Sequence, residues 1–234
     1  MRGLPQAELL ALWEAGRSLG PLDRGILAAC TASPEMENAA DWPLGRRNRA
    51  LAQLHCAAFG GVLRGWTACR GCDGQLEFEF DMRRVAEAAP EPPAQRAVTV
   101  GKWRFRLPTS RDLAVASAEK SEPAAARHLL NACWVGPEPA NANWSDEDLQ
   151  AIEEHLAQAD PLAEIRLHFD CPACSASFDE NLDLGDFVWA EIESQAKQVL
   201  REVHLLARAY GWSESEILAL SPARRSTYLE IVLA

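Results

Sequence analysis

The chain has 234 residues, of which 48% are hydrophobic and 24% charged, a balance that excludes intrinsic disorder and suits one large or two small domains. Its net charge of −11 argues against loose electrostatic binding to nucleic acid, and no stretch approaches the ~20 apolar residues of a membrane-spanning helix. Charged residues within the first twenty positions interrupt any signal-peptide core, so we expect a cytoplasmic protein.

Residues 1–66 are predicted to form an N-terminal helical segment. Apolar residues at helical spacing indicate a helix over residues 4–16, and Pro21 suits the first turn of a second helix. A turn-like stretch at 41–48 precedes a third helix, whose apolar face would consist of Leu51, Leu54, His55, Ala58 and Phe59.

Alternating apolar residues indicate an α+β core over residues 67–184, with a helical insert at 82–163. Phe78 and Phe80 point to one face of a strand that has glutamates on its other face. A second alternating strand is predicted at 163–169. The expected fold class is α+β, an antiparallel sheet with a long helical insert, flanked by N-terminal helices and a C-terminal helical segment.

The insert begins with a proline-rich, linker-like stretch at 87–95. Residues 97–108 predict a hairpin that turns at Gly101, because glycine suits the first position of a type II′ turn. Three helical patterns follow within residues 111–158, and the last begins at Ser145, with Asp148 placed to complete a capping box. The insert is therefore expected to be a subdomain of its own.

Two Cys-x-x-Cys pairs stand at the two ends of this core, Cys69 with Cys72 and Cys171 with Cys174. A gap of two residues lets both thiolates of one tight turn, or knuckle, reach a single metal ion, and two knuckles complete the site of a zinc ribbon. The pairs are separated by more than the usual span of about 15–20 residues, but loop-closure entropy rises only logarithmically with length. The prediction is a zinc-ribbon-like core with one structural zinc per chain, about 2.3 Å from each sulfur. Knuckles more than about 10 Å apart would contradict it.

Other interpretations of the cysteines remain open at this point. A thioredoxin-like redox pair would begin a helix after a parallel strand, whereas both pairs lie between strand-like segments. Disulfides are uncommon in the cytosol, and the cysteine count of seven is odd. The pairs could also bind nothing. Among the remaining residues, Cys30, Cys56 and Cys133 are expected in the core, and His168 is expected on a strand surface unless it substitutes for a ligand.

Four thiolates close the coordination shell of the metal, and the sequence contains no His-Glu-x-x-His motif. A catalytic zinc needs an open position for water and a neighbouring base. The sequence therefore predicts a structural metal and no enzymatic activity.

Residues 185–234 predict a C-terminal helical segment. Its first helix ends at Gly211 and carries an apolar seam of about three heptads, formed by Trp189, Ile192, Ala196, Val199, Val203, Leu206 and Tyr210. Two short helices, opened by Ser213 and Ser221, follow. They hold more apolar residues than they can bury between themselves, so they pack on the chain's own core or bind a partner. The candidate partner-binding residues are Trp212, Ile217, Leu220, Tyr228, Leu229 and Val232, and residues 212–234 are predicted to serve partner binding more than the zinc core.

Two short basic clusters are expected to be solvated faces of a helix and a strand, Arg46-Arg47-Arg49 and Lys102-Arg104-Arg106. Together with Arg111, the second cluster could line one edge of a zinc-ribbon nucleic-acid-binding regulator, which is the alternative function. The acidic net charge opposes this alternative.

Four stretches resemble one protein family. They are WPLGRRNRALAQLHCAAFGGVL before the first knuckle, FRLPTSRDL, the second knuckle with FVWAEI, and the tail EVHLLARAYGWSESEILALSPARRSTYLEIV. Across residues 20–234 the chain resembles the baseplate hub assembly proteins, or chaperones, of contractile-tailed phages and phage-like contractile injection systems. The resemblance implies a structural or assembly role without an active site, baseplate or hub proteins as partners, and a cytoplasmic or particle-associated location.

Overall fold

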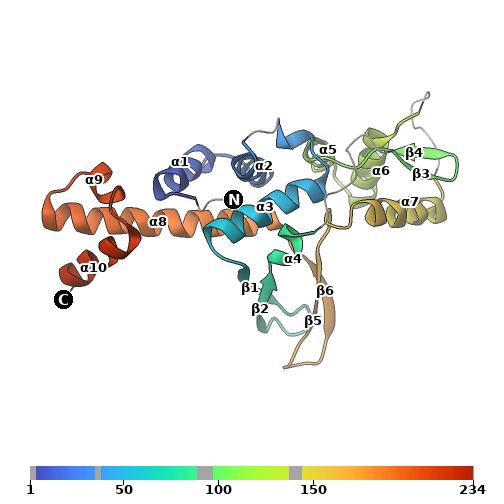
Figure 1. Ribbon diagram of the computed structural model, residues 1–234. Helices are drawn as coiled ribbons and strands as arrows, with labels where there is room; N and C mark the ends of the chain where they lie inside the picture. Colours follow the sequence, from blue (N-terminus) through green and yellow to red (C-terminus); the bar gives the residue numbers. More distant parts are fainter. Residues whose placement is uncertain (1–3, 35–37, 89–96, 137–143, 234) are drawn as a thin grey trace.

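The computed structural model describes residues 4–34, 38–88, 97–136 and 144–233. Helices form an elongated body along one long helix, and two β-hairpins project from it side by side (Figure 1). The α+β class is confirmed. In place of one antiparallel sheet, however, the strands of the described residues form three separate two-stranded antiparallel ladders.

The N-terminal segment consists of α1 (Gln6–Gly16), α2 (Pro21–Ala32), the short 3₁₀ helix η1 (Ala39–Asp41) and α3 (Leu44–Ala58). The turn predicted at 41–48 is wrong beyond Leu44, where α3 already begins. Pro43 fixes a φ of −50° just before this helix, and the Gly45 N–H donates to Asp160 Oδ2 at 3.0 Å. A distant carboxylate therefore satisfies an amide of the first turn, which no local pattern reveals.

The two projecting hairpins are β1 (Val62–Ala68) with β2 (Gln75–Asp81), and β5 (Arg166–Asp170) with β6 (Ser177–Asn181). The expectation that residues up to 66 are helical is wrong for β1. Leu63 is its single buried side chain, and Gly65 faces Phe78 across the ladder, so the strand shows almost no apolar alternation. A Cβ at Gly65 would lie 2.6 Å from Phe78 Cζ, which explains why glycine occupies this strand position.

The insert contains α4 (Arg83–Ala86), a hairpin of β3 (Val98–Val100) and β4 (Trp103–Phe105), and the helices α5 (Ser110–Ala116), α6 (Glu122–Cys133) and α7 (Asp146–Ala159). The predicted turn is confirmed, with Gly101 at a φ of +58°, and so is the capping box of Ser145 and Asp148. From residue 89 onward, the predicted linker lies outside the described residues.

Two separate hydrophobic cores hold the described residues together. The larger core joins α1, α2, α3 and the hairpins to the long helix, and the smaller one lies within the insert, where Phe105 and Ile152 are fully buried. A polar seam connects the insert to α3: the Leu44 N–H donates to the Pro108 carbonyl at 3.1 Å, and Asn48 donates to the Leu162 carbonyl at 2.8 Å. The buried residues of the insert thus form a cluster of their own.

The C-terminal segment consists of α8 (Leu184–Tyr210), α9 (Glu214–Leu218) and α10 (Pro222–Leu233). The predicted seam of α8 is buried except at its last residue, Tyr210, which is 38% exposed. Gly211 ends the helix in the left-handed conformation, and Ser213 with Glu216 forms the predicted capping box. Both short helices fold back on the far end of α8 (Figure 1).

Candidate metal centre

The two knuckles, residues 69–74 and 171–176, have the same backbone turn. In each, the amide of the first cysteine donates to the carbonyl five residues later, at 2.8 Å and 2.9 Å, and its carbonyl accepts the amide four residues later, at 2.9 Å and 2.8 Å. The residue after the second cysteine is left-handed in both, with φ of 56° at Asp73 and 59° at Ser175. The shared turn places both sulfurs of each pair on one side of the backbone.

The four sulfurs converge at the tips of the two hairpins. All four lie within 4.8 Å of one another; Cys69 Sγ is 3.5 Å from Cys174 Sγ, and Cys72 Sγ is 3.7 Å from Cys171 Sγ. Sulfurs arranged as a tetrahedron about a zinc ion would be about 3.8 Å apart. The predicted convergence is confirmed, and each hairpin supplies one buried and one exposed cysteine: Cys69 and Cys171 are buried, Cys72 and Cys174 exposed.

Opposing electrostatic effects act on the second knuckle. The backbone N–H groups of Cys174 and Ala173 aim at the Cys171 sulfur and lower its pKa to about 6. The Ala176 N–H lowers the pKa of Cys174, but the neighbouring sulfurs, Cys69 foremost, raise it to about 12. Four thiolates so close together repel one another, so a bound cation is what would let all four ionise.

An aromatic layer behind the sulfurs fixes the two hairpins to each other and to α8. The Phe78 ring meets Phe169 at 5.5 Å and Phe187 at 5.9 Å, both edge to face, and Phe169 stacks on Phe178 at 5.5 Å. The two Phe78 contacts join residues 91 and 109 positions apart in the chain. Arg70 adds an ion pair to Glu180 across the hairpins at 3.0 Å.

The remaining cysteines and His168 lie away from the cluster. Cys133 is buried in the insert core, where burial raises the pKa of its thiol to about 12, and Cys30 and Cys56 are half-buried against the main core. His168 is exposed on β5 and lies 2.7 Å from Asp179, which raises the pKa of its imidazole. The surface expectation for His168 and the core expectation for Cys133 are confirmed.

The candidate partner-binding residues of the tail pack largely against the chain itself. Ile217 is fully buried. Trp212 stacks on Tyr210 at 4.6 Å, and the Tyr228 ring meets these two rings edge to face at 5.0 and 5.6 Å. The other three members of the set, Leu220, Leu229 and Val232, are half-buried. Ile231 and Leu233, which are 61% and 69% exposed, are the tail's most exposed large apolar residues. Neither residue is among the six candidate partner-binding residues.

The basic clusters are less solvated than the sequence suggested. Arg47 is buried and donates to Ser110 Oγ at 3.2 Å, so the solvated-face expectation is wrong there. Its side chain lies where α3 meets the insert, a contact between segments about sixty residues apart. Arg46, in contrast, lies over the Trp42 ring at 4.6 Å.

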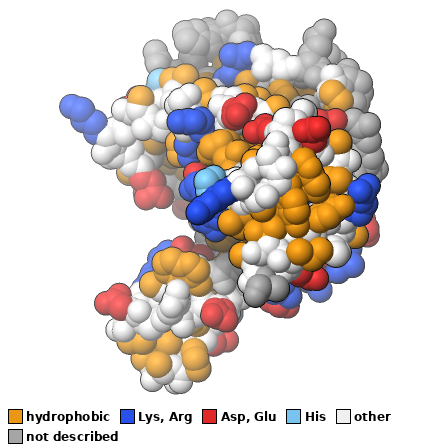
Figure 2. Space-filling view, turned by 90° about the vertical axis from the view of Figure 1, so that its left-hand side faces the viewer, with side chains coloured by type: hydrophobic (Ala, Val, Ile, Leu, Met, Phe, Trp, Pro, Cys, Tyr) orange, Lys and Arg blue, Asp and Glu red, His pale blue; other side chains and the backbone are white. Residues whose placement is uncertain are grey.

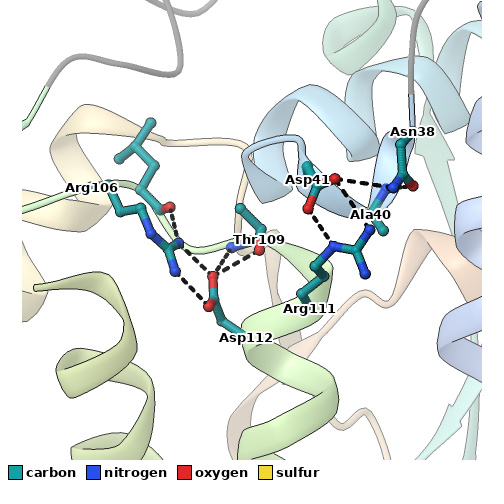
Figure 3. Close-up of polar contacts among 8 residues, drawn as sticks. Asn38, Ala40, Asp41, Arg106, Thr109, Arg111 and Asp112 are labelled. Carbon is teal, nitrogen blue, oxygen red and sulfur yellow. Dashed lines mark hydrogen bonds and ion pairs between the residues drawn. The ribbon is translucent and has the colours of Figure 1, made fainter.

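Carboxylates neutralise two of the four cations that could line a nucleic-acid edge. Arg106 forms a two-pronged pair with Asp112 at 2.6 and 2.7 Å, and Arg111 pairs with Asp41 (Figure 3). Asp112 also accepts hydrogen bonds from the Thr109 amide and hydroxyl, in the capping box of α5. These residues line a notch of about 280 Å³. Through the Arg111–Asp41 pair, they connect the insert to η1.

Within the described part of the chain, no helix combines the length and apolarity needed to cross a membrane. Comparisons of the chain with protein-family models, with curated proteins and with solved structures find no match.

Proposed function

We propose that the chain is a non-enzymatic assembly factor or minor structural component of a contractile, phage-tail-like baseplate, stabilised by one structural zinc ion. The observation that carries the zinc part of the proposal is the convergence of four cysteine sulfurs from two hairpins separated by about a hundred residues. One ion held there would fasten both ends of the core across the insert.

The chemistry of the donor set favours zinc. Four soft thiolates in a tetrahedron suit zinc or iron, and two Cys-x-x-Cys knuckles are the usual ligands of structural zinc. Cys69, Cys72, Cys171 and Cys174 would be the ligands, and such a closed shell has no position for water or substrate. Elemental analysis of the purified chain tests this part: one zinc per chain is expected, and an iron-loaded chain would overturn it.

The baseplate assignment rests on the sequence resemblance over residues 20–234, and the surface of the tail supports protein contacts. Figure 2 faces the end of the molecule that carries α9 and α10, where hydrophobic side chains gather in a broad patch. Ile231 and Leu233 are the most exposed large apolar residues of this segment. In the proposal, they contact a baseplate or hub protein, in the cytoplasm or on the particle.

The nucleic-acid alternative is the weaker proposal. Arg106 and Arg111 already have carboxylate partners, and the chain is acidic overall. A phosphate backbone would have to displace Asp112 and Asp41 to reach them.

Affinity purification from cells that produce the tail system tests the function. The tagged wild-type chain should recover baseplate or hub proteins, and Ile231→Ser with Leu233→Ser should reduce that recovery. Val115→Ser is the matched control, because Val115 is 50% exposed on α5 of the insert. Purification of the wild-type chain without any tail protein would contradict the proposal.

A further inference from the structure

Trp66 is the one exposed tryptophan of the chain. All eight tryptophans lie within the described residues, and the other seven are buried or half-buried. Trp66 is 62% exposed on β1, three residues before Cys69, the first residue of the first knuckle. Burying an exposed indole is among the largest apolar gains available to a protein surface, so this position points to a ligand.

The surroundings of Trp66 are acidic. Glu77 faces it directly across the β1–β2 ladder, and neighbouring cross-strand side chains lie about 5 Å apart. Arg64, on the same face, is held by Glu79 at 2.8 Å. Glu77 has no such partner among the described residues, and Trp66 and Glu77 line an open depression of about 470 Å³. An indole face and a free carboxylate thus adjoin.

We propose that this outer face of the β1–β2 hairpin binds a lysine or arginine side chain from a basic segment of a partner protein. The cation would lie over the Trp66 ring and pair with the Glu77 carboxylate. Residues 62–81 carry two arginines against four acidic residues, a net charge of −2, within a chain of net charge −11. The negative electrostatic potential of this face attracts a basic segment as it approaches and repels an acidic one.

The same observations disfavour nucleic acid at this face. An exposed tryptophan can stack on a base, but phosphates would approach Glu77 and Glu79 and be repelled. The inference needs only a folded hairpin, so it does not depend on the baseplate proposal.

Calorimetric titration of the full chain with a ten-residue arginine peptide tests the inference, with a ten-residue glutamate peptide as the charge-reversed probe. Trp66→Ala and Glu77→Gln should each weaken arginine-peptide binding about two- to fivefold, the range of an exposed cation–π contact or ion pair. Trp66→Phe should fall between wild type and Trp66→Ala, because a phenyl ring attracts cations less strongly. Glu230→Gln is the matched control, since it removes one exposed charge from α10.

Three outcomes would overturn the inference. If Glu230→Gln and Glu77→Gln weaken arginine-peptide binding equally, the binding depends on net charge alone and not on this face. Unchanged affinity of Trp66→Ala for the arginine peptide would show that the Trp66 ring is not part of the binding site. Binding of a deoxythymidine oligonucleotide that is lost in Trp66→Ala would assign the face to nucleic acid. Circular dichroism of each variant should match wild type, because both side chains are exposed.

Discussion

At the scale of single residues, the candidate metal centre depends on two non-glycine residues in left-handed backbone. Asp73 and Ser175 occupy equivalent positions one residue after the second cysteine of each knuckle. Such a conformation costs about 1 kcal/mol or more for a side-chain-bearing residue, so the surrounding turn must hold it. The paired amide–carbonyl hydrogen bonds of each knuckle provide that support.

Cys69→Ser is expected to abolish stoichiometric zinc binding and to lower the free energy of unfolding by about 4 kcal/mol or more, because metal binding is folding free energy. Native mass spectrometry and denaturant titration measure the two effects. Cys30→Ser, half-buried outside the cluster, is the control and should keep the metal. A Cys69→Ser chain with wild-type stability in the presence of zinc would contradict a structural role.

Asp112 makes the folding stability of the chain depend on pH in a predictable way. Burial alone would raise the pKa of its carboxyl, but hydrogen bonds from Arg106 and Thr109 lower it below the ordinary 3.8. A lowered folded-state pKa stabilises the fold above the unfolded value, and this contribution is lost as pH falls through the folded-state pKa.

Asp112→Asn should therefore cost about 1–3 kcal/mol at neutral pH, and the difference from wild type should shrink below about pH 4. Denaturant titrations across this pH range measure it. Asp148→Asn, at the same capping position of α7, should cost less, because the Asp148 hydrogen bond to Ser145 is exposed. If the stability difference between Asp112→Asn and wild type does not change with pH, ionisation of Asp112 is not what stabilises its contacts with Arg106 and Thr109.

At the scale of elements, α8 connects every part of the larger core. Its 27 residues carry the aromatic layer at one end and the packed tail at the other. At the tail end, Arg225 of α10 is almost fully buried and pairs with Glu202 of α8 at 2.8 Å. Burying this pair requires α10 to stay in place, so the tail is part of the folded unit as well as a candidate contact surface.

Replacing two isoleucines of the tail by alanine should affect stability very unequally. Ile217→Ala is expected to destabilise the chain by about 2–5 kcal/mol, because the side chain is fully buried against α8. Ile231→Ala, at 61% exposure, should change stability by less than about 0.5 kcal/mol. Thermal unfolding measures both. Equal effects would mean that the tail is not packed on α8 in solution.

A chain truncated after Gly211 is expected to keep its zinc, because all four cysteines lie outside the deleted segment. It should lose its partner and become prone to aggregation, because the buried Leu206 and Val203 of α8 would be uncovered. Zinc content, light scattering and co-purification distinguish these effects. If the truncated chain still bound its partner, residues 212–234 would not be part of the interface.

At the scale of the whole molecule, the two cores predict an uneven response to chelation. The hairpins carry the four candidate ligands and share Leu63 and Phe78 with the larger core, whereas the insert surrounds its own Phe105 and Ile152. Hydrogen exchange after zinc removal should show loss of amide protection in β1, β2, β5 and β6 first. The amides of α6 and α7 should stay protected. Simultaneous loss in the insert would show that the two cores unfold as one.

The sequence by itself determined the features that depend on neighbours within one or two turns. The cysteine pairs, the capping boxes of Ser145 and Ser213, the stop at Gly211 and the seam of α8 each follow from spacing of four residues or fewer, repeated along the chain. For this reason the longer helices, the insert hairpin and the four candidate ligands were predictable.

Only the tertiary structure decided how the distant parts meet. β1 was missed because Gly65 leaves room for Phe78 and so breaks the alternation. The start of α3 and the burial of Arg47 depend on the insert, through Asp160 and Ser110. The exposure of Trp66 likewise depends on which face of the hairpin packs against α8. Burial and cross-chain hydrogen bonds are set by residues tens of positions away, and a local pattern contains no information about them.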